Sequence, residues 1–289
     1  MHPVDTQARP ATRLRWWKEA LTIAAFYGLY SIVRNTQGSA SVSQTHAYRN
    51  ATLVIRIERR FHLFFERGVQ QVFEGMGAAT RVFFQFWNTY YGVAHFVVTI
   101  VALVWLFRRD PQRYPLWRNT LALTTGLALI GFATFPLMPP RLLPFHELNV
   151  LHLSPPTHHF VDTLDKFGGP WSFENGPISK VSNQFAAMPS LHFGWSSWCA
   201  CVMYPMLRRR WTRVLAVAYP FITLFAIVVT ANHYILDAVG GAFVFGLAFL
   251  LARWATPRME ARWDRRTDAG GQSHVGALAE TQPRDRARS

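Results

Sequence analysis

The sequence is short of charge and of cysteine. Only 16% of its 289 residues are Asp, Glu, Lys or Arg, whereas about a quarter are charged in a typical soluble domain. There are two cysteines, Cys199 and Cys201, and positions two apart on a helix point in different directions. This scarcity excludes a disulfide framework and a metal site built from cysteines.

Apolar and basic residues dominate instead. Half of the residues are hydrophobic, including 23 Phe and 11 Trp, while the net charge is +14. A disordered basic chain would not hold so many large aromatic residues, and a nucleic-acid-binding protein would not need so much apolar surface. The composition favours a polytopic membrane protein with its charge confined to loops, and we expect no nucleic-acid partner.

Six apolar runs are long enough to cross a membrane. Each has about 17 to 26 residues, which as a helix spans a hydrocarbon core roughly 30 Å thick. They cover residues 17–33, 82–107, 119–138, 191–207, 214–231 and 233–252. The sequence therefore predicts an all-α fold, a six-transmembrane-helix bundle. We expect a polar N-terminal segment over 1–16, a six-helix catalytic domain over 17–255 and a disordered, Arg-rich tail over 256–289.

The stretch 51–73, between the first two runs, is amphipathic. Its apolar residues recur at three- and four-residue spacing, with Arg and Glu between them. The apolar set is Leu53, Ile57, Phe61, Phe64, Phe65, Val69 and Val72, and the charged set is Arg56, Glu58, Arg59, Arg60, Glu66 and Arg67. The pattern predicts an interfacial helix that lies on the membrane surface with its arginines near lipid headgroups.

The distribution of basic residues indicates the orientation. With a cytoplasmic N-terminus, 20 of the 30 Lys and Arg residues fall in the inside segments 1–18, 108–118, 208–213 and 253–289. Both termini are therefore expected in the cytoplasm, where these segments would attract anionic lipid headgroups. The excess of Arg over Lys is typical of a high-GC bacterial genome, so we expect a multi-pass protein of a bacterial plasma membrane.

Two helix starts carry the residues best suited to chemistry. In Met188-Pro189-Ser190-Leu191-His192, Ser190 is a good cap for the fourth run and His192 falls in its first turn. In Asn232-His233-Tyr234-Ile235-Leu236-Asp237, Asn232 is a good cap for the sixth run. His233 begins that helix, and Asp237 lies four residues on, on the same helix face. In the orientation above, both starts lie at the outer membrane face.

Phosphate esters are the ligands that this arrangement favours. Unsatisfied N–H groups and the helix dipole attract anions at helix starts. One imidazole, oriented by Asp237, can attack phosphorus while the other protonates the leaving oxygen. Arg141, just outside the third run, is the leading candidate for a phosphate-binding cation, and Lys180 lies in the same outer segment. We expect neither a metal ion nor another cofactor.

Several of these residues have plainer interpretations. A helical His-x-x-x-Asp is often a local pair, Ser190 is more readily a cap than a substrate ligand, and Arg141 is as readily a headgroup anchor. His95 in the second run either lines a substrate cavity or makes a structural hydrogen bond to a neighbouring helix. The histidines between the third and fourth runs lack a firm metal-ligand spacing; they are His146, His152, His158 and His159.

The two histidine motifs resemble those of a known family. The run Ala-Ala-Met-Pro-Ser-Leu-His-Phe-Gly-Trp at 186–195 and the run Asn-His-Tyr-Ile-Leu-Asp-Ala-Val-Gly-Gly at 232–241 look like the type 2 phosphatidic acid phosphatase superfamily. The closer match is the branch that contains the fungal inositol phosphorylceramide synthases and their bacterial relatives. Met-Pro-Pro-Arg-Leu at 138–142 is similar to a motif of that branch. The resemblance covers residues 17–252.

The resemblance implies metal-independent phosphoryl transfer through a phosphohistidine. On that mapping His233 is the nucleophile, Asp237 orients it and His192 is the general acid, while Asn183 and Ser190 are active-site neighbours. The broader family carries a Lys-x6-Arg-Pro motif that is missing here. Ala226 and Ile227 stand where it has Ser-Arg, so the phosphate cradle must be built differently.

We therefore expect a lipid phosphotransferase or phosphatase with an extracytoplasmic site. Its partners are a lipid phosphate or phosphodiester within the bilayer and either a hydroxyl acceptor or water. The expected substrate-binding residues are Arg141, Lys180, Asn183, Ser190 and Asn232. The alternative is a transporter that uses intramembrane His and Asp as an ion or proton path. Against it, no paired halves are evident, and the ionisable residues gather at one membrane face.

Overall fold

The computed structural model of the protein describes residues 43–143, 160–168 and 185–279, with side chains up to residue 257, and a few positions between 16 and 28. Within these ranges the chain is mostly helical and holds no β-strand, only an isolated bridge between Leu137 and Ala186. The predicted first membrane run, 17–33, lies mostly outside the described residues. So do Lys180, Asn183 and the four loop histidines.

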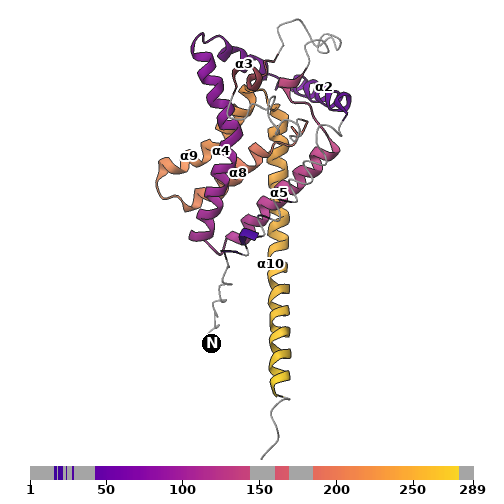
Figure 1. Ribbon diagram of the computed structural model, residues 1–289, viewed down its shortest axis with the longest axis vertical. Coiled ribbons are helices and arrows are strands. Elements are labelled where there is room, and N and C mark those ends of the chain that lie inside the picture. The colour runs from indigo at the N-terminus through magenta and orange to yellow at the C-terminus, as the bar shows by residue number, and fades with distance from the viewer. Residues whose placement is uncertain are drawn as a thin grey trace, which may run out of the picture.

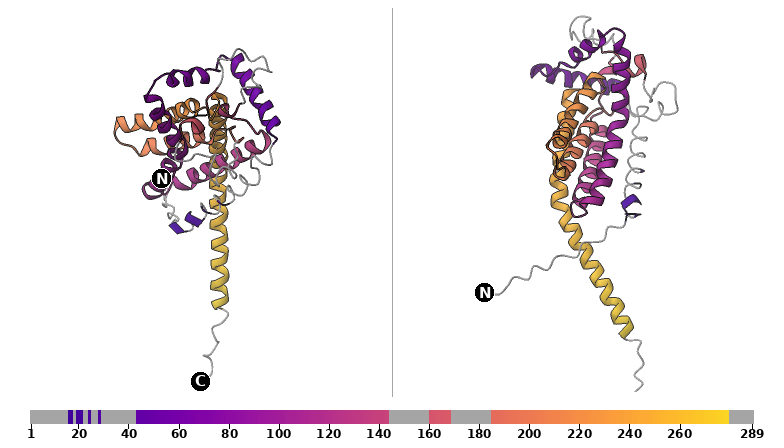
Figure 2. Two further views of the ribbon diagram at one scale, coloured as in Figure 1. Left: turned by 45° about the horizontal axis from the view of Figure 1, so that its top comes forward. Right: turned by 90° about the vertical axis from the view of Figure 1, so that its left-hand side faces the viewer.

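The helices form one bundle, and a long C-terminal helix extends from it (Figure 1). Their bounds are α2 Gln44–Arg60, α3 Glu66–Glu74, α4 Ala79–Arg109, α5 Tyr114–Thr134, η1 Pro140–Leu142, α7 Thr163–Phe167, α8 Leu191–Met203, η3 Tyr204–Met206, α9 Arg210–Val229 and α10 Ile235–Ala279. α10 packs against α5 and α8, and α8 packs against α4 and α9. Short α2 and α3 lie at the end of the bundle where α10 begins, and the far half of α10 extends beyond the other helices (Figures 1 and 2).

Three of the described helices are long and apolar enough to cross a membrane. They are α4, α9 and the first part of α10, Ile235–Pro257. α5, which is 21 residues long and carries Arg118, is not one of these three. α8 has only 13 residues, about 20 Å of helix at 1.5 Å per residue, so it is shorter than a hydrocarbon core by itself. α10 continues in helical backbone to Ala279, through much of the segment for which the sequence predicts disorder.

α8 also carries both cysteines. Cys199 is buried and Cys201 is exposed, and both are free. This confirms that the two side chains point in different directions.

The amphipathic stretch 51–73 is two helices, where the sequence predicts one. α2 ends at Arg60, the chain turns through His62, whose φ is +57°, and α3 begins at Glu66. We call this turn and the two helices the elbow. The exposed and buried faces also differ from the prediction: Phe61 and Phe65 are exposed, whereas Glu58 is buried. The reason is a set of hydrogen bonds to α10, described below.

A small apolar core fixes the elbow to the rest of the bundle. It combines residues of α2, of the segment after α5, of the segment before α8 and of the segment before α10: Ala47, Ala51, Val54, Ile55, Leu137, Met138, Leu143, Phe185, Ala187 and Tyr234. Backbone bonds join the same segments, since Met138 donates to the carbonyl of Ala47 and Leu137 donates to that of Phe185. This core brings α2 next to the two histidine motifs.

Candidate functional site

Two helix starts that are distant in sequence meet at one end of the bundle. α8 begins after its cap residue Ser190, and α10 begins at Ile235. The backbone N–H of Ser190 donates to the carbonyl oxygen of Asp237 across an N–O distance of 2.9 Å. This close approach depends on Gly241, because a methyl group there would collide with the carbonyl oxygen of Ser190. The first turns of α8 and α10 are thereby held side by side.

The imidazoles of His192 and His233 face each other across this junction. Nε2 of His233 lies 3.4 Å from Nδ1 of His192, and Nδ1 of His233 lies 3.2 Å from Oδ2 of Asp237. His233 and Asp237 are buried, whereas His192 is partly exposed. A carboxylate only accepts, so Nδ1 of His233 carries the hydrogen and the lone pair of a neutral ring lies on Nε2. The structure thus brings together the three residues that the motifs predict to act together.

Asp237 also organises the start of its own helix. Its Oδ2 accepts from the backbone N–H of Tyr234 at 3.0 Å, the return bond of a capping box. The prediction that Asn232 caps this helix and that His233 begins it is wrong by two residues, since α10 begins at Ile235. The physical reason is that Asp237 caps Tyr234, while the amide of Asn232 donates to Thr230.

Arg141 holds the segment that leads into His233. Its backbone N–H donates to the carbonyl of Ala231 at 2.8 Å, and its Nε donates to Oδ1 of Asn232 at 3.0 Å. Its Nη1 lies 2.6 Å from Oδ2 of Asp162, and the side chain is largely buried. The burial and these bonds do not fit a headgroup anchor. They place Arg141 and Asn232 directly beside the residue that carries the paired imidazole.

Two aromatic rings of α4 surround His192. The Tyr91 ring stacks on the imidazole and the His95 ring meets it edge-on, both with centroids 4.2 Å away. Nδ1 of His95 lies 3.0 Å from the carbonyl oxygen of Tyr91, so this hydrogen bond lies within α4 and does not reach a neighbouring helix. Nothing in the sequence distinguishes Tyr91, because it is one of many aromatic residues in an apolar run.

Ser190 is buried, and its hydroxyl accepts from the backbone N–H of Phe193 at 3.5 Å. The prediction that Ser190 caps α8 is confirmed. The other predicted neighbours of this motif, Lys180 and Asn183, lie outside the described residues.

Two glutamates of the elbow belong to the junction, although the sequence predicts them on the charged face of a surface helix. Oε1 of Glu66 accepts from the N–H of Ile235 at 3.0 Å, and Oε1 of Glu58 accepts from the N–H of Leu236 at 2.7 Å. These N–H groups belong to the first turn of α10, so two carboxyl groups already occupy the helix end that the sequence predicts to attract a phosphate. Burial raises the pKa of both carboxyl groups, and the neighbouring charge of Glu66 raises that of Glu58 further. Local sequence carries no signal for contacts that span 169 and 178 residues.

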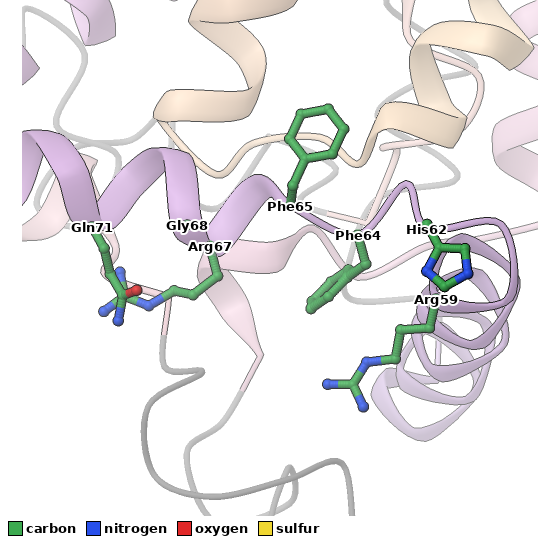
Figure 3. A pocket seen from close by; sticks show the side chains of 7 residues that line it. All are labelled: Arg59, His62, Phe64, Phe65, Arg67, Gly68 and Gln71. Carbon is green, nitrogen blue, oxygen red and sulfur yellow. The ribbon is translucent and has the colours of Figure 1, made fainter.

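A cavity of about 530 Å³ opens at the elbow (Figure 3). It is lined by Arg59, His62, Phe64, Phe65, Arg67, Gly68 and Gln71. The paired histidines do not line it, so this cavity is separate from the junction. Among the residues that the structure describes, no group of three or more His, Cys, Asp or Glu side chains is arranged to hold a metal ion.

The family model described as the PAP2 superfamily matches residues 52–251 of the chain. Both histidine motifs, Arg141 and the two buried glutamates lie within this range. Comparison with curated proteins and with solved structures finds no match. The assignment of a family therefore comes from the family model.

Proposed function

The chain belongs to the PAP2 superfamily, and on this premise we propose that it is an integral-membrane lipid phosphotransferase or phosphatase that acts through a phosphohistidine. The observation that carries the proposal is the hydrogen-bonded series Asp237, His233 and His192. It presents one oriented nucleophilic nitrogen beside a second imidazole. No feature of the described residues favours the transporter alternative.

In the proposed first step, Nε2 of His233 attacks phosphorus. The N–P bond forms as the ester P–O bond breaks, and His192 gives its proton to the leaving oxygen. Asp237 keeps the hydrogen on Nδ1 of His233 and stabilises the positive charge that develops on that ring. In the second step a hydroxyl or water attacks phosphorus, His192 takes the proton, and the N–P bond breaks.

The substrate requires a movement of His192. A phosphoryl group does not fit between nitrogens that lie 3.4 Å apart, so the His192 imidazole must swing aside when the lipid binds. This ring is partly exposed and packs against Tyr91 and His95. Hydrogen bonds between catalytic groups commonly adopt their working geometry only with substrate present.

We propose that Arg141 and Asn232 contact the phosphate, with Ser190, Asn183 and Lys180 as further ligands. The Met-Pro-Pro-Arg-Leu motif supports the inositol phosphorylceramide synthase-like branch, in which a hydroxyl acceptor replaces water. Arg141 and Asn232 are joined through Nε and Oδ1. The guanidinium geometry suits phosphate oxygens, which would compete with Asp162 for Nη1.

The membrane arrangement that we propose has six spans. The spans are α4, α9 and α10 together with the predicted run 17–33, α5 and the short α8. In this arrangement α2 and α3 lie at the membrane interface. The positive-inside rule supports cytoplasmic termini and an extracytoplasmic site in the plasma membrane. The start of α10 and the elbow share the end of the bundle opposite to the far part of α10 (Figure 1), which supports the same arrangement.

Trapping of the phosphoenzyme tests this mechanism. Purified protein is mixed with a lipid extract carrying radioactive phosphate, and the label on the protein is tested for acid lability and alkali stability, the signature of phosphohistidine. We expect His233→Ala to remove the label and to lower turnover by at least about a thousandfold. Mass spectrometry of the products distinguishes transfer to a hydroxyl from hydrolysis.

The matched control is His46→Ala, since His46 is an exposed histidine of α2, and this variant should label like the wild type. A chelator should leave turnover unchanged, because no step uses a metal ion. Full labelling of the His233→Ala variant, or loss of activity in chelator, would contradict the proposed mechanism.

A further inference from the structure

Two buried carboxyl groups cap the start of α10 from outside that helix. Glu58 lies in the last turn of α2 and Glu66 is the first residue of α3, and both are fully buried, with 0% exposure. Each uses Oε1 to accept from a backbone N–H of α10. In each, the second oxygen, Oε2, is buried and accepts no hydrogen bond from an N–H or hydroxyl group of the described residues. Two ionised carboxylates in this state would be very unfavourable.

A single proton resolves the conflict. When Glu58 is protonated it donates to Glu66, a bond that raises the pKa of Glu58 and lowers that of Glu66. Burial, the largest cause, and the charge of Glu66 raise the pKa of Glu58 to about 10. The pair therefore holds a proton at neutral pH, because neighbouring buried carboxyls do not both ionise.

We propose that Glu58 and Glu66 are a proton-sharing pair of positioning residues that hold His233 and Asp237 in their working geometry. The inference rests on the proposed function, since it assigns the pair a role in that reaction. The pair bonds to the N–H groups of Ile235 and Leu236, which lie between His233 and Asp237 in sequence. Without these caps the first turn of α10 loses two of its hydrogen bonds and frays. The carboxylate of Asp237 then no longer fixes the imidazole of His233, and small displacements of reacting groups are costly.

Exchange of carboxyl for amide distinguishes a shared proton from simple packing. In Glu58→Gln or Glu66→Gln the amide oxygen still caps α10, and the NH2 group donates to the remaining carboxylate as the proton does. In the double variant, Glu58→Gln with Glu66→Gln, two NH2 groups face each other and neither finds an acceptor. Each single substitution should therefore preserve the hydrogen bonds at the start of α10, whereas the double substitution should disrupt them.

The experiment measures kcat and KM for the full-length protein in lipid nanodiscs. We expect each single Gln variant to keep kcat within about threefold of the wild type, and the double variant to lose at least about tenfold, the size of coupling found between residues in direct contact. Glu58→Ala should lower kcat by at least about tenfold with little change in KM, because the substrate-binding groups are untouched. Glu74→Gln is the matched control, since Glu74 lies on α3 and pairs with Arg67 away from α10.

Amide hydrogen exchange provides a readout that does not depend on turnover. The N–H groups of Ile235 and Leu236 should exchange slowly in the wild type and the single Gln variants, and much faster in the double Gln and Ala variants. If the Ala variants do not fold, the Gln variants alone decide, because they preserve side-chain volume.

Two results would overturn the inference: wild-type kcat in a folded Glu58→Ala variant, or a double Gln variant that matches its parents in both kcat and exchange. Absence of phosphoryl transfer in the wild type would instead refute the proposed function and, with it, the catalytic role of the pair. The exchange experiment would then still decide whether the pair caps α10.

Discussion

At the scale of single residues, Arg141 has two competing uses. Its guanidinium is bonded to Asn232 and paired with Asp162, which also caps α7 by accepting from Leu164 and Asp165. The cation is therefore satisfied within the protein, yet it stands beside the residue that precedes His233. If Arg141 binds phosphate, the substrate competes with Asp162 for the same donors. If its role is only structural, the ion pair with Asp162 holds the segment before His233 in place and removal of either partner has the same effect.

Substitution of either partner separates these uses. Arg141→Ala should lower kcat/KM by about 10- to 100-fold, because a lost hydrogen bond to a charged group costs about 1.5–3 kcal/mol. Asp162→Asn should leave kcat/KM unchanged or higher, since Asn caps a helix as well as Asp and the guanidinium is released for phosphate. Steady-state kinetics of both variants provide the measurement. Equal losses in the two variants would show that Arg141 acts through its ion pair.

At the scale of elements, the junction depends on how closely two helices cross. Gly241 of α10 lies against the backbone carbonyl of Ser190, and Gly194 of α8 lies in turn against the carbonyl of Gly241. Side chains at these positions would separate the helix starts that carry His192 and His233. Glycine is needed here for close approach of two backbones and not for an unusual φ.

Gly241→Ala tests this contact. The added methyl group would meet the carbonyl oxygen of Ser190, and overpacking of this kind costs about 1–3 kcal/mol. We expect a lower unfolding temperature in nanodiscs and a loss of turnover, because His192 and His233 move apart. Gly246→Ala on the same helix is the control. Its new Cβ has open space, so turnover should be retained. Equal behaviour of the two variants would argue against a role for the close crossing.

The elbow shows how an amphipathic pattern can be misread. The spacing of apolar residues over 51–73 correctly indicates helix, but it does not show that a turn at His62 divides the helix or that Glu58 and Glu66 face inward. Charged residues are ordinarily assigned to the solvated face, because burial of an unpaired charge is costly. Here the N–H groups of α10 and a shared proton offset that cost.

At the scale of the whole molecule, the buried pair links stability to pH. The pKa of Glu58 is near 4.5 in the unfolded chain and is raised to about 10 in the fold by burial and by Glu66. Between these values the folded protein holds a proton that the unfolded chain has released, so stability falls as pH rises through this window. The contribution is fully present below about 4.5 and is lost above about 10.

Thermal unfolding in nanodiscs across this pH range measures the effect. The unfolding temperature of the wild type should fall as pH rises, and that of Glu58→Gln should fall less steeply, because the amide does not titrate. A curve of equal slope in the two proteins would show that Glu58 does not hold the proton. The control Glu74→Gln should retain the wild-type slope.

Features that depend on residues close together in the chain could be predicted from the sequence alone. Apolar runs predict the helices, since α4, α5, α9 and the start of α10 overlap the runs 82–107, 119–138, 214–231 and 233–252. The spacing of four residues correctly predicts contact between His233 and Asp237, although His233 lies just before α10 and the contact is made across the start of the helix. The composition around Ser190 likewise predicts the start of α8. All of these features depend on residues close together in the chain.

Tertiary structure alone decided the rest. His192 and His233 are 41 positions apart, and their contact requires the close crossing at Gly241. The bonds from Arg141 to Asn232 and from the two glutamates to α10 span 91 residues or more. No periodicity encodes such contacts, because they depend on which helix faces meet when the whole chain packs. The sequence identified the paired histidines and Asp237, whereas only the fold brought the carboxyl groups of Glu58 and Glu66 to the start of α10.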